Sequence, residues 1–309
     1  MNRLSSRRLL IVAATALVLT GCSGSGQQPP GTGTGTASAV SASTSGGRSG
    51  DRPYDVDVPS GYDGTAAVPL LILLHGYTTT GSQMDSYFSM RAEADREGFL
   101  YVHPDGTKDS TGAQFWNATD ACCDRDGTSV DDSAYLDGII RDVSSRYRVD
   151  PARVYLFGVS NGGFMAYRMA CDHADTIAGV VSMAGATFLD PSRCTPSRPV
   201  TVLEIHGTAD ETVPYGGGEL FGPAFPSAPD TVAQWARFDD CAAKRTPTGR
   251  RLDLAVDVTG AETVVSAFGG CTHGTSVQLW TVQGVDHVFS FTDALVPDAV
   301  SFLLAHPQR

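Results

Sequence analysis

Residues 153–163 read RVYLFGVSNGG, an apolar run that leads into a serine with a glycine two residues away on each side. The apolar run predicts a buried β-strand, and the pattern G-x-S-x-G places Ser160 at the turn into a following helix. Gly158 and Gly162 allow a turn so tight that side chains there would clash. The alternative is a glycine-rich strand-to-helix turn that serves only packing. Because a strand precedes the motif and a helix follows it, we favour Ser160 as a nucleophile held on that turn.

The chain around this motif alternates, from Val68 onward, between apolar runs of strand length and longer amphipathic stretches. Near-continuous apolar strands separated by helices predict an α/β fold, with a mostly parallel central sheet and helices on both faces. The clearest helical pattern spans 129–150, with Ser129 as the expected N-cap. Residues 216–229, rich in glycine and proline, are expected to form an irregular loop. Strands are predicted at 68–76, 99–106, 153–158, 177–185, 200–207 and 277–284, and helices at 82–98, 129–150, 161–174 and, with an interruption, 291–306.

Two further polar residues follow the ends of predicted strands. Asp210 comes after the strand 200–207, and His287 comes after the strand 277–284. Parallel sheets gather catalytic groups at the carboxyl ends of their strands, and the order serine, acid, histidine is that of the α/β-hydrolases. Ser160, His287 and Asp210 therefore predict a nucleophile, a general base and an acid that fixes the tautomer of the base. Three other histidines fit the role of the base less well: His206, His273 and His306.

An acyl-transfer site of this kind also needs donors for the oxyanion that forms on attack. The backbone N–H of Asn161 opens a predicted helix, where N–H groups lack partners and the helix dipole favours negative charge. The second donor is expected in the turn after the strand 68–76, at the backbone N–H of Tyr77. The sequence has no C-x-x-C pair and no His/Cys spacing typical of zinc ligands, so we expect neither a metal nor a cofactor.

The first residues have the pattern of an export signal. Three arginines precede an apolar run that is too short for an ordinary membrane-spanning helix, and the LTGC that ends at Cys22 resembles a bacterial lipobox. We therefore predict a lipoprotein signal peptide at 1–21, lipidation of Cys22, a flexible Gly/Ser/Thr tether over 22–51 and a catalytic domain over 52–309. The alternative is an ordinary secretory signal with a chance cysteine. The expected location is outside the cytoplasm, with a lipid anchor in the cell membrane.

The charge of the chain limits the kinds of partner that it can bind, and its cysteine content indicates the compartment in which it folds. The formal net charge is -12 and no basic cluster is present, which argues against nucleic-acid binding; we expect a monomer. Beside the candidate for lipidation, six of the seven cysteines remain, an even number that suits disulfides in an exported protein. A bridge between Cys171 and Cys194 would brace the helix after the serine. Cys122 and Cys123 either pair with each other, or one of them reaches Cys171 or Cys194.

Several short motifs together resemble a known family. LLHGY (73–77), FWNATDACC (115–123), HGTADETVPY (206–215) and GVDHVF (284–289), together with the serine motif, are similar to those of a group in the α/β-hydrolase superfamily. This group contains the extracellular polyhydroxybutyrate depolymerase-like proteins and the feruloyl and acetylxylan esterases. The resemblance implies the α/β-hydrolase fold. It also implies an exported serine esterase that removes feruloyl or acetyl groups from polysaccharide.

The resemblance has further implications for the site and for the cysteines. It implies a disulfide between Cys241 and Cys271, and substrate contacts at Trp116 and Asn117 in a loop at the rim of the site. Two other functions stay open: a polyhydroxyalkanoate or other polyester depolymerase, and a surface-binding lipoprotein that keeps the fold without turnover. Depolymerases of this type often have a cysteine where this chain has Tyr77, which favours the polysaccharide esterase. The complete set of serine, acid and histidine favours an enzyme over a binding protein.

Overall fold

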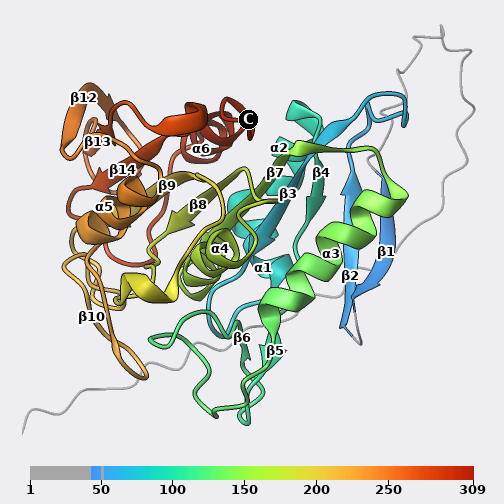
Figure 1. Ribbon diagram of the computed structural model, residues 1–309, viewed down its shortest axis with the longest axis horizontal. Helices are drawn as coiled ribbons and strands as arrows, with labels where there is room; N and C mark the ends of the chain where they lie inside the picture. Colours follow the sequence, from blue (N-terminus) through green and yellow to red (C-terminus); the bar gives the residue numbers. More distant parts are fainter. Residues whose placement is uncertain (1–42, 50–51) are drawn as a thin grey trace, which may run out of the picture. The chain divides into compact units, whose positions relative to one another are not determined.

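The computed structural model describes residues 43–49 and 52–309 (Figure 1). The predicted signal peptide, Cys22 and most of the predicted tether lie outside the described residues. Within the described part of the chain, no helix is long and apolar enough to cross a membrane. The strands of the main sheet are β1 (Ser43–Ser49), β2 (Arg52–Val58), β3 (Val68–Leu74), β4 (Leu100–Val102), β7 (Val149–Val159), β8 (Gly179–Met183), β9 (Thr201–Gly207), β12 (Arg245–Leu252), β13 (Thr263–Phe268) and β14 (Val277–Val282).

This main sheet has ten strands in the order β1-β2-β4-β3-β7-β8-β9-β14-β13-β12. The strands from β4 to β14 pair in parallel, and the pairs at both ends of the sheet are antiparallel. The prediction of a mostly parallel central sheet is therefore confirmed. Two small antiparallel ribbons stand apart from this sheet: β5 (Thr107–Lys108) with β6 (Gln114–Phe115), and β10 (Gly218–Glu219) with β11 (Ala224–Phe225).

Alternate residues of β3 show how the two faces of the sheet are covered. Leu70, Ile72 and Leu74 belong to one buried cluster, and Leu71 and Leu73 belong to another. The first cluster includes apolar side chains of α3, α4 and α5, and the second those of α1, α2 and α6. Because successive side chains of a strand point to opposite faces, helices cover both faces, as predicted. The helices are α1 (Gly81–Phe88), α2 (Met90–Glu97), α3 (Asp132–Arg146), α4 (Asn161–Asp172), α5 (Ala228–Phe238) and α6 (Leu295–Leu304).

Two of the predicted helices differ in detail from the observed ones. The segment 82–98 forms two helices, because Ser89 adopts a left-handed backbone conformation (φ 51°, ψ 35°) that ends α1 and precedes α2. The prediction of Ser129 as the cap of α3 is wrong. The side chain of Asp131 instead accepts a hydrogen bond of 2.9 Å from the backbone N–H of Ala134, because the helix begins later than its apolar pattern.

Several elements near the ends of the sheet differ from what the sequence pattern predicts. Strand β1 falls inside the segment 22–51, which was predicted as tether, and it pairs with β2 along its whole length. The folded domain therefore begins before the predicted boundary at residue 52. Strands β12 and β13 form an antiparallel pair that no pattern predicted, since β12 is exposed and polar along most of its length. The predicted irregular loop 216–229 contains the ribbon β10–β11 and the start of α5.

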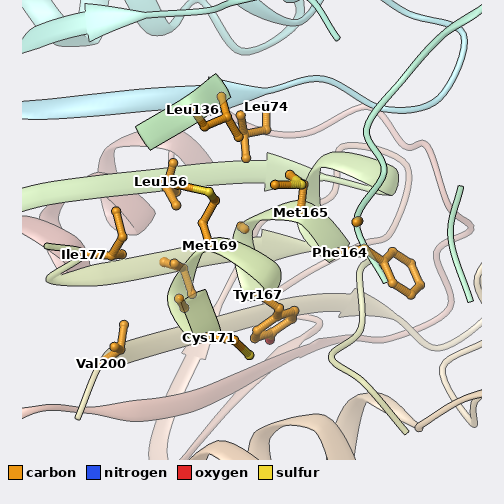
Figure 2. Close-up of a cluster of buried hydrophobic side chains, with 14 of the residues drawn as sticks. Leu74, Leu136, Leu156, Phe164, Met165, Tyr167, Met169, Cys171, Ile177 and Val200 are labelled. Atoms are coloured by element: carbon orange, nitrogen blue, oxygen red, sulfur yellow. The ribbon is translucent and has the colours of Figure 1, made fainter. Parts of the chain in front are cut away.

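Helix α4, which follows Ser160, is buried along most of its length. In Figure 2, Met169 of this helix lies close to Leu156 of the neighbouring strand β7, and both belong to the cluster that packs α4 against the sheet. Burying apolar side chains on several sides fixes the helix axis and therefore the position of its first residue. The packing of α4 therefore also fixes the position of its first turn. This position matters because the N–H groups of the first turn face the predicted site.

Three disulfides are present in the described residues. Cys171, at the end of α4, is bonded to Cys194, and Cys241 is bonded to Cys271. The first bridge joins α4 to the loop after β8, and the second is the one implied by the family resemblance; both predictions are confirmed. The remaining alternative is resolved by a bond between the adjacent residues Cys122 and Cys123.

Candidate active site

The strand order changes direction between β3 and β7. From β3 the chain crosses to β4 on one side and then to β7 on the other. Such a reversal leaves a crevice at the carboxyl ends of the two strands, where ligands of α/β sheets bind. The loop after β3 contains Tyr77 and the loop after β7 contains Ser160, and a Cβ placed on Gly76 would lie only 3.4 Å from the Cβ of Ser160. The topology therefore brings the predicted nucleophile and the predicted oxyanion turn together.

Ser160 occupies a backbone conformation that few residues adopt, with φ 55° and ψ −123°. The neighbouring glycines make this turn possible. A Cβ on Gly158 would lie 2.0 Å from the carbonyl oxygen of Gly162, and a Cβ on Gly162 would lie 2.1 Å from the carbonyl oxygen of Leu74. Both contacts are with backbone atoms, so no side-chain movement relieves them. Only glycine at these two positions lets the strand, the turn and the helix approach so closely.

The structure brings the three predicted catalytic side chains together. Nε2 of His287 lies 2.8 Å from Oγ of Ser160, and Nδ1 of His287 lies 2.8 Å from Oδ2 of Asp210. With its proton on Nδ1, His287 donates to Asp210 and keeps Nε2 free to accept the proton of Ser160. The side chain of Asp210 has no exposed surface, whereas that of His287 is 12% exposed. The acid is thus shielded from water while one edge of the base stays accessible.

The Asp210 carboxylate is held by donors on both of its oxygen atoms. The backbone N–H groups of Thr212 and Val213 donate to Oδ1 at 2.9 and 2.7 Å. Oδ2 faces His287 and also lies 3.4 Å from Nε2 of His206. Burial alone would raise the pKa of this carboxyl, but the hydrogen bonds from His206 and His287 more than offset burial and hold that pKa well below its ordinary value. Asp210 therefore stays a carboxylate across the neutral range.

The two predicted oxyanion donors are available. Among the described backbone hydrogen bonds, neither the N–H of Tyr77 nor that of Asn161 donates to a protein acceptor. The turn that contains Tyr77 is held by His75, whose Nδ1–H donates to the carbonyl oxygen of Gly76 and whose Nε2 accepts from the N–H of Gly106, each at 2.8 Å. Burial lowers the pKa of His75, so the ring stays neutral and keeps both bonds.

Trp116 supports this arrangement from the protein interior. Its backbone N–H donates to Oδ1 of Asn161 at 2.7 Å, and its carbonyl oxygen accepts from Nδ2 of Asn161 at 2.9 Å. Its indole N–H donates to the carbonyl oxygen of His75 at 3.0 Å. The predicted substrate contact of Trp116 does not hold, because its side chain has no exposed surface. The residue instead ties the two oxyanion turns to each other.

Asn117 is engaged within its own loop. Its backbone N–H donates to Oδ2 of Asp132 at 2.7 Å, and its Nδ2 donates to the carbonyl oxygen of Val130 at 2.8 Å. Asp132 in turn pairs with Arg52 at 2.7 Å. These bonds fasten the loop to the start of α3, so Asn117 has a structural role here and its predicted contact with substrate stays a prediction.

Two functional histidines were missed by sequence reasoning. His75 holds the oxyanion turn, and His206, which was set aside as a base, lies against the carboxylate of Asp210. Each is followed directly by a glycine at the end of a predicted strand, as His75-Gly76 and His206-Gly207. This repeated His-Gly pattern is the feature of the sequence that could have drawn attention to both residues, although it does not give their roles. No group of three or more His, Cys, Asp or Glu side chains in the described chain is arranged to hold a metal ion.

An aromatic surface lies beside the oxyanion turn. The ring centroid of Phe221, a residue that is 47% exposed, lies 5.5 Å from that of Tyr77. The guanidinium of Arg125 lies 4.8 Å from the Phe221 ring centroid and 3.5 Å from the Tyr77 hydroxyl. The Tyr77 hydroxyl also donates to Asp109. We refer to Tyr77, Arg125 and Phe221 as the aromatic rim; rings of this kind stack on sugars and on phenolic groups.

Comparison with known proteins identifies part of the chain. Residues 53–201 match the family model described as esterase PHB depolymerase. Feruloyl esterase B of Piromyces equi is 30% identical over 242 residues, which cover 75% of this chain and 42% of that protein. A bifunctional acetylxylan esterase/xylanase of Neocallimastix patriciarum is 33% identical over 153 residues, which cover 50% of this chain and 21% of that protein. The chain therefore spans less than half the length of either relative.

Solved structures give the fold of the whole described domain. The acetyl xylan esterase from Aspergillus awamori superposes with a TM-score of 0.56 and 15% identity, covering 84% of this chain and 98% of that chain. At such low identity the similarity concerns the arrangement of strands and helices, which agrees with the parallel sheet and its two helical layers. Residues 53–201 thus match the esterase PHB depolymerase family model, within a chain that has the α/β-hydrolase fold.

Proposed function

We propose that this chain is an exported serine esterase that removes acyl groups, feruloyl or acetyl, from polysaccharide. The observation that carries the proposal is the line of two hydrogen bonds, each 2.8 Å long, from Ser160 through His287 to Asp210. A serine hydroxyl is a poor nucleophile until a neighbouring base accepts its proton, and this arrangement supplies that base. The feruloyl and acetylxylan esterases among its relatives support an ester as substrate.

The first half of the reaction transfers the acyl group to the enzyme. Oγ of Ser160 attacks the ester carbonyl carbon while Nε2 of His287 takes the hydroxyl proton. The negative charge that develops on the carbonyl oxygen is stabilised by the N–H groups of Tyr77 and Asn161. The bond to the alcohol oxygen then breaks, and His287 returns the proton to that oxygen. The alcohol leaves, and the acyl group remains on Ser160.

The second half repeats these steps with water. His287 takes a proton from a water molecule, whose oxygen attacks the acyl carbon and forms a second oxyanion in the same pair of donors. The bond to Oγ breaks, and His287 gives the proton back to Ser160. The carboxylic acid leaves, and the enzyme returns to its starting state. Asp210 remains ionised throughout and stabilises the imidazolium form of His287.

The surroundings of the oxyanion turn suit a substrate with an aromatic ring or a sugar. The aromatic rim lies next to the oxyanion turn, where a phenolic ring or a sugar can stack on Phe221. This surface favours an ester that carries a ring or a sugar close to its carbonyl group.

We also propose that the protein acts outside the cytoplasm, attached to the membrane through a lipid on Cys22. Its disulfides support an oxidising compartment, because such bonds are rare where thiols are kept reduced. The substitution Cys22→Ser should move the protein from the membrane fraction to the medium without changing its specific activity. Equal membrane retention of this variant would contradict the lipid anchor.

Labelling with a fluorophosphonate probe tests the proposed chemistry, because only an activated serine reacts with it. We expect labelling of the native protein and none of Ser160→Ala. The substitution Ser301→Ala, at an exposed serine of α6, is the matched control and should label normally. Absence of labelling in the native protein would favour a surface-binding protein without turnover.

The matched family model favours a second candidate substrate, a polyester such as polyhydroxybutyrate. A panel of methyl ferulate, acetylated xylan, short nitrophenyl esters and polyhydroxybutyrate separates the two. We expect the highest kcat/KM with methyl ferulate or acetylated xylan. Faster turnover of polyhydroxybutyrate than of either would replace polysaccharide esters by polyesters as the substrate class.

A further inference from the structure

A buried chain of polar contacts continues beyond Asp210, away from Ser160. Nε2 of His206 lies 3.4 Å from Oδ2 of Asp210 and 2.8 Å from the carbonyl oxygen of Val213. Nδ1 of the same ring lies 2.8 Å from Oε1 of Glu204. The hydroxyl of Tyr167 donates to the other oxygen of Glu204, also at 2.8 Å. The side chains of His206 and Glu204 are at most 1% exposed, so water does not replace these contacts.

The arrangement determines how many protons the His206 ring carries. With Glu204 ionised, both ring nitrogens of His206 face oxygens that only accept hydrogen bonds. Burial raises the pKa of Glu204, and the hydrogen bonds from His206 and Tyr167 act in the opposite direction and favour the carboxylate. A neutral imidazole has a single N–H, so one nitrogen would present its lone pair to an oxygen lone pair. Two N–H groups satisfy both contacts, and the ring is then an imidazolium. Burial opposes this charge, but the hydrogen bonds to Asp210 and Glu204 outweigh burial and raise the pKa of His206 to about 10.

The β-sheet determines that the charge on His206 lies beside Glu204. Glu204 and His206 are two residues apart on β9, so their side chains leave the strand on the same face. Tyr167 of α4, one of the buried side chains in Figure 2, covers that face and reaches Glu204. A buried cation is stable only beside compensating anions, and His206 has one on each side.

Within the described residues, the elements packed against the His206 ring bring no further charged group into contact with it. From the loop after β9, Tyr215 presents its ring edge-on at 5.6 Å, and its hydroxyl bonds Thr281. The neighbouring strands contribute Ser182 opposite Glu204 and Thr281 opposite His206, neither of which titrates near neutral pH. The groups that set the charge are therefore Glu204, Asp210 and, through Asp210, His287.

We infer that His206 is a positioning residue of the triad: a fixed buried imidazolium that holds the Asp210 carboxylate toward His287 and partly cancels the negative charge that His287 senses. The inference rests on the proposed esterase function. Without His206, Asp210 keeps its backbone donors on Oδ1 but loses a partner on Oδ2. The uncancelled carboxylate then favours the protonated form of His287, which cannot accept a proton from Ser160.

The pH dependence of Ser160 labelling by a fluorophosphonate distinguishes this role from a structural one. For His206→Gln we expect labelling at neutral pH to slow by about 10- to 100-fold. This is the range found when a residue that orients a metal-ligating side chain is replaced, and we expect a similar effect for a residue that orients Asp210. We also expect the acid limb of the rate profile to move to higher pH by about 1 unit. The reason is the loss of the positive charge of His206, which lies on the other side of the Asp210 carboxylate from His287. His306→Gln, at the end of α6, is the matched control and should change neither quantity.

A second variant guards against misfolding. His206→Gln alone leaves Glu204 buried without its cation, so the double variant Glu204→Gln/His206→Gln removes the pair together. The same shift of the acid limb is expected, because its origin is the lost imidazolium. An unmoved acid limb in both variants, with rates reduced only in proportion to the folded fraction, would assign His206 a structural role and overturn the inference.

Nitrogen-15 NMR of histidine-labelled native protein tests the charge without any need for turnover. The His206 signals, identified by their loss in His206→Gln, should show both ring nitrogens protonated from pH 5 to beyond pH 8. A neutral ring at pH 8 would overturn the inference even if Ser160 reacts normally. A charged ring in a protein whose Ser160 never reacts would refute the esterase and with it the positioning role, while the charge itself would stand.

Discussion

Ser160 and His287 are separated by 127 residues in the chain, yet Oγ of the first lies 2.8 Å from Nε2 of the second. They follow β7 and β14, which are separated in the sheet by β8 and β9. Because β7 and β14 do not pair with each other, the loops that follow them are not aligned by strand pairing. Each loop must therefore be held by its own contacts. The glycines around Ser160 hold one loop, and the carboxylate of Asp210 holds the ring on the other.

His287→Ala removes the proton acceptor and should lower kcat for short nitrophenyl esters by up to about 10⁶-fold. Ser160→Ala should be equally damaging, and the double variant no worse, because the two side chains act as a unit. Circular dichroism should show an unchanged fold. More than a tenth of native activity in either single variant would contradict the assignment of the triad.

Asp210→Asn should lower kcat/KM by about 10⁴-fold, because the amide no longer selects the His287 tautomer with its proton on Nδ1. The amide oxygen can still accept from the backbone donors of the loop, so the fold should remain. Asp239→Asn is the matched control: this buried aspartate accepts from the N–H of Val200 and makes no contact with His287. If the control loses activity and Asp210→Asn does not, the acid has been misassigned.

Asn161→Ala should destabilise the protein by about 2 to 4 kcal/mol, because it leaves the buried N–H and C=O of Trp116 without partners. Urea unfolding measures this loss. Trp116→Phe keeps both backbone bonds and loses only the indole bond to His75, so a loss of about 1 kcal/mol from that bond is expected, in addition to any change in packing. An unchanged urea midpoint for Asn161→Ala would mean that these bonds do not hold the two turns together.

Phe221→Ala should raise KM for methyl ferulate roughly 3- to 10-fold with little change in kcat, since aromatic stacking contributes a modest amount of binding energy. Steady-state kinetics with methyl ferulate and with a short nitrophenyl acetate provide the comparison. The acetate lacks a ring on the acyl side and should be nearly unaffected. An equal rise in KM for both esters would argue against stacking on the aromatic rim.

Asp239 should make stability depend on pH. Burial raises the pKa of its carboxyl from 3.8 to about 7 in the folded protein. The folded state therefore binds the proton more tightly than the unfolded state, and the stabilisation is complete at low pH and is lost as pH rises toward 7. Relative to Asp239→Asn, the native protein should lose about 2 to 4 kcal/mol between acidic pH and pH 8, measured by urea unfolding. Equal pH dependence of both proteins would contradict a buried, neutral Asp239.

Those parts of the fold were predictable that appear in the sequence as a pattern of apolar residues. β3 and β9 are buried along nearly their whole length and read as continuous apolar or mostly apolar runs, which mark central parallel strands. β1 and β12 could not be found in this way, because edge strands need bury little and their residues are largely polar. The break at Ser89 was also invisible, since a left-handed residue inside a helical pattern leaves the apolar spacing intact.

The close approach of Ser160, His287 and Asp210 was predictable because each residue follows a strand whose end is set by the sheet. The roles of Trp116 and His206 were not, because they depend on which side chains meet across different loops. A tryptophan next to a polar loop is equally consistent with substrate contact and with burial, and only its bonds to His75 and Asn161 decide. The charge on His206 likewise follows from acceptors on both sides of one ring.

The disulfide between Cys241 and Cys271 encloses the exposed strand β12. Along the chain, this strand comes after Ser160 and Asp210 and before His287. A protease that cuts inside this loop would separate a fragment with Ser160 and Asp210 from a fragment with His287. The bridge would nevertheless keep both fragments in one molecule, so a nicked protein would keep its mass on a non-reducing gel and fall apart only with a reductant. Proteolytic damage to this hairpin thus need not separate Ser160 from His287.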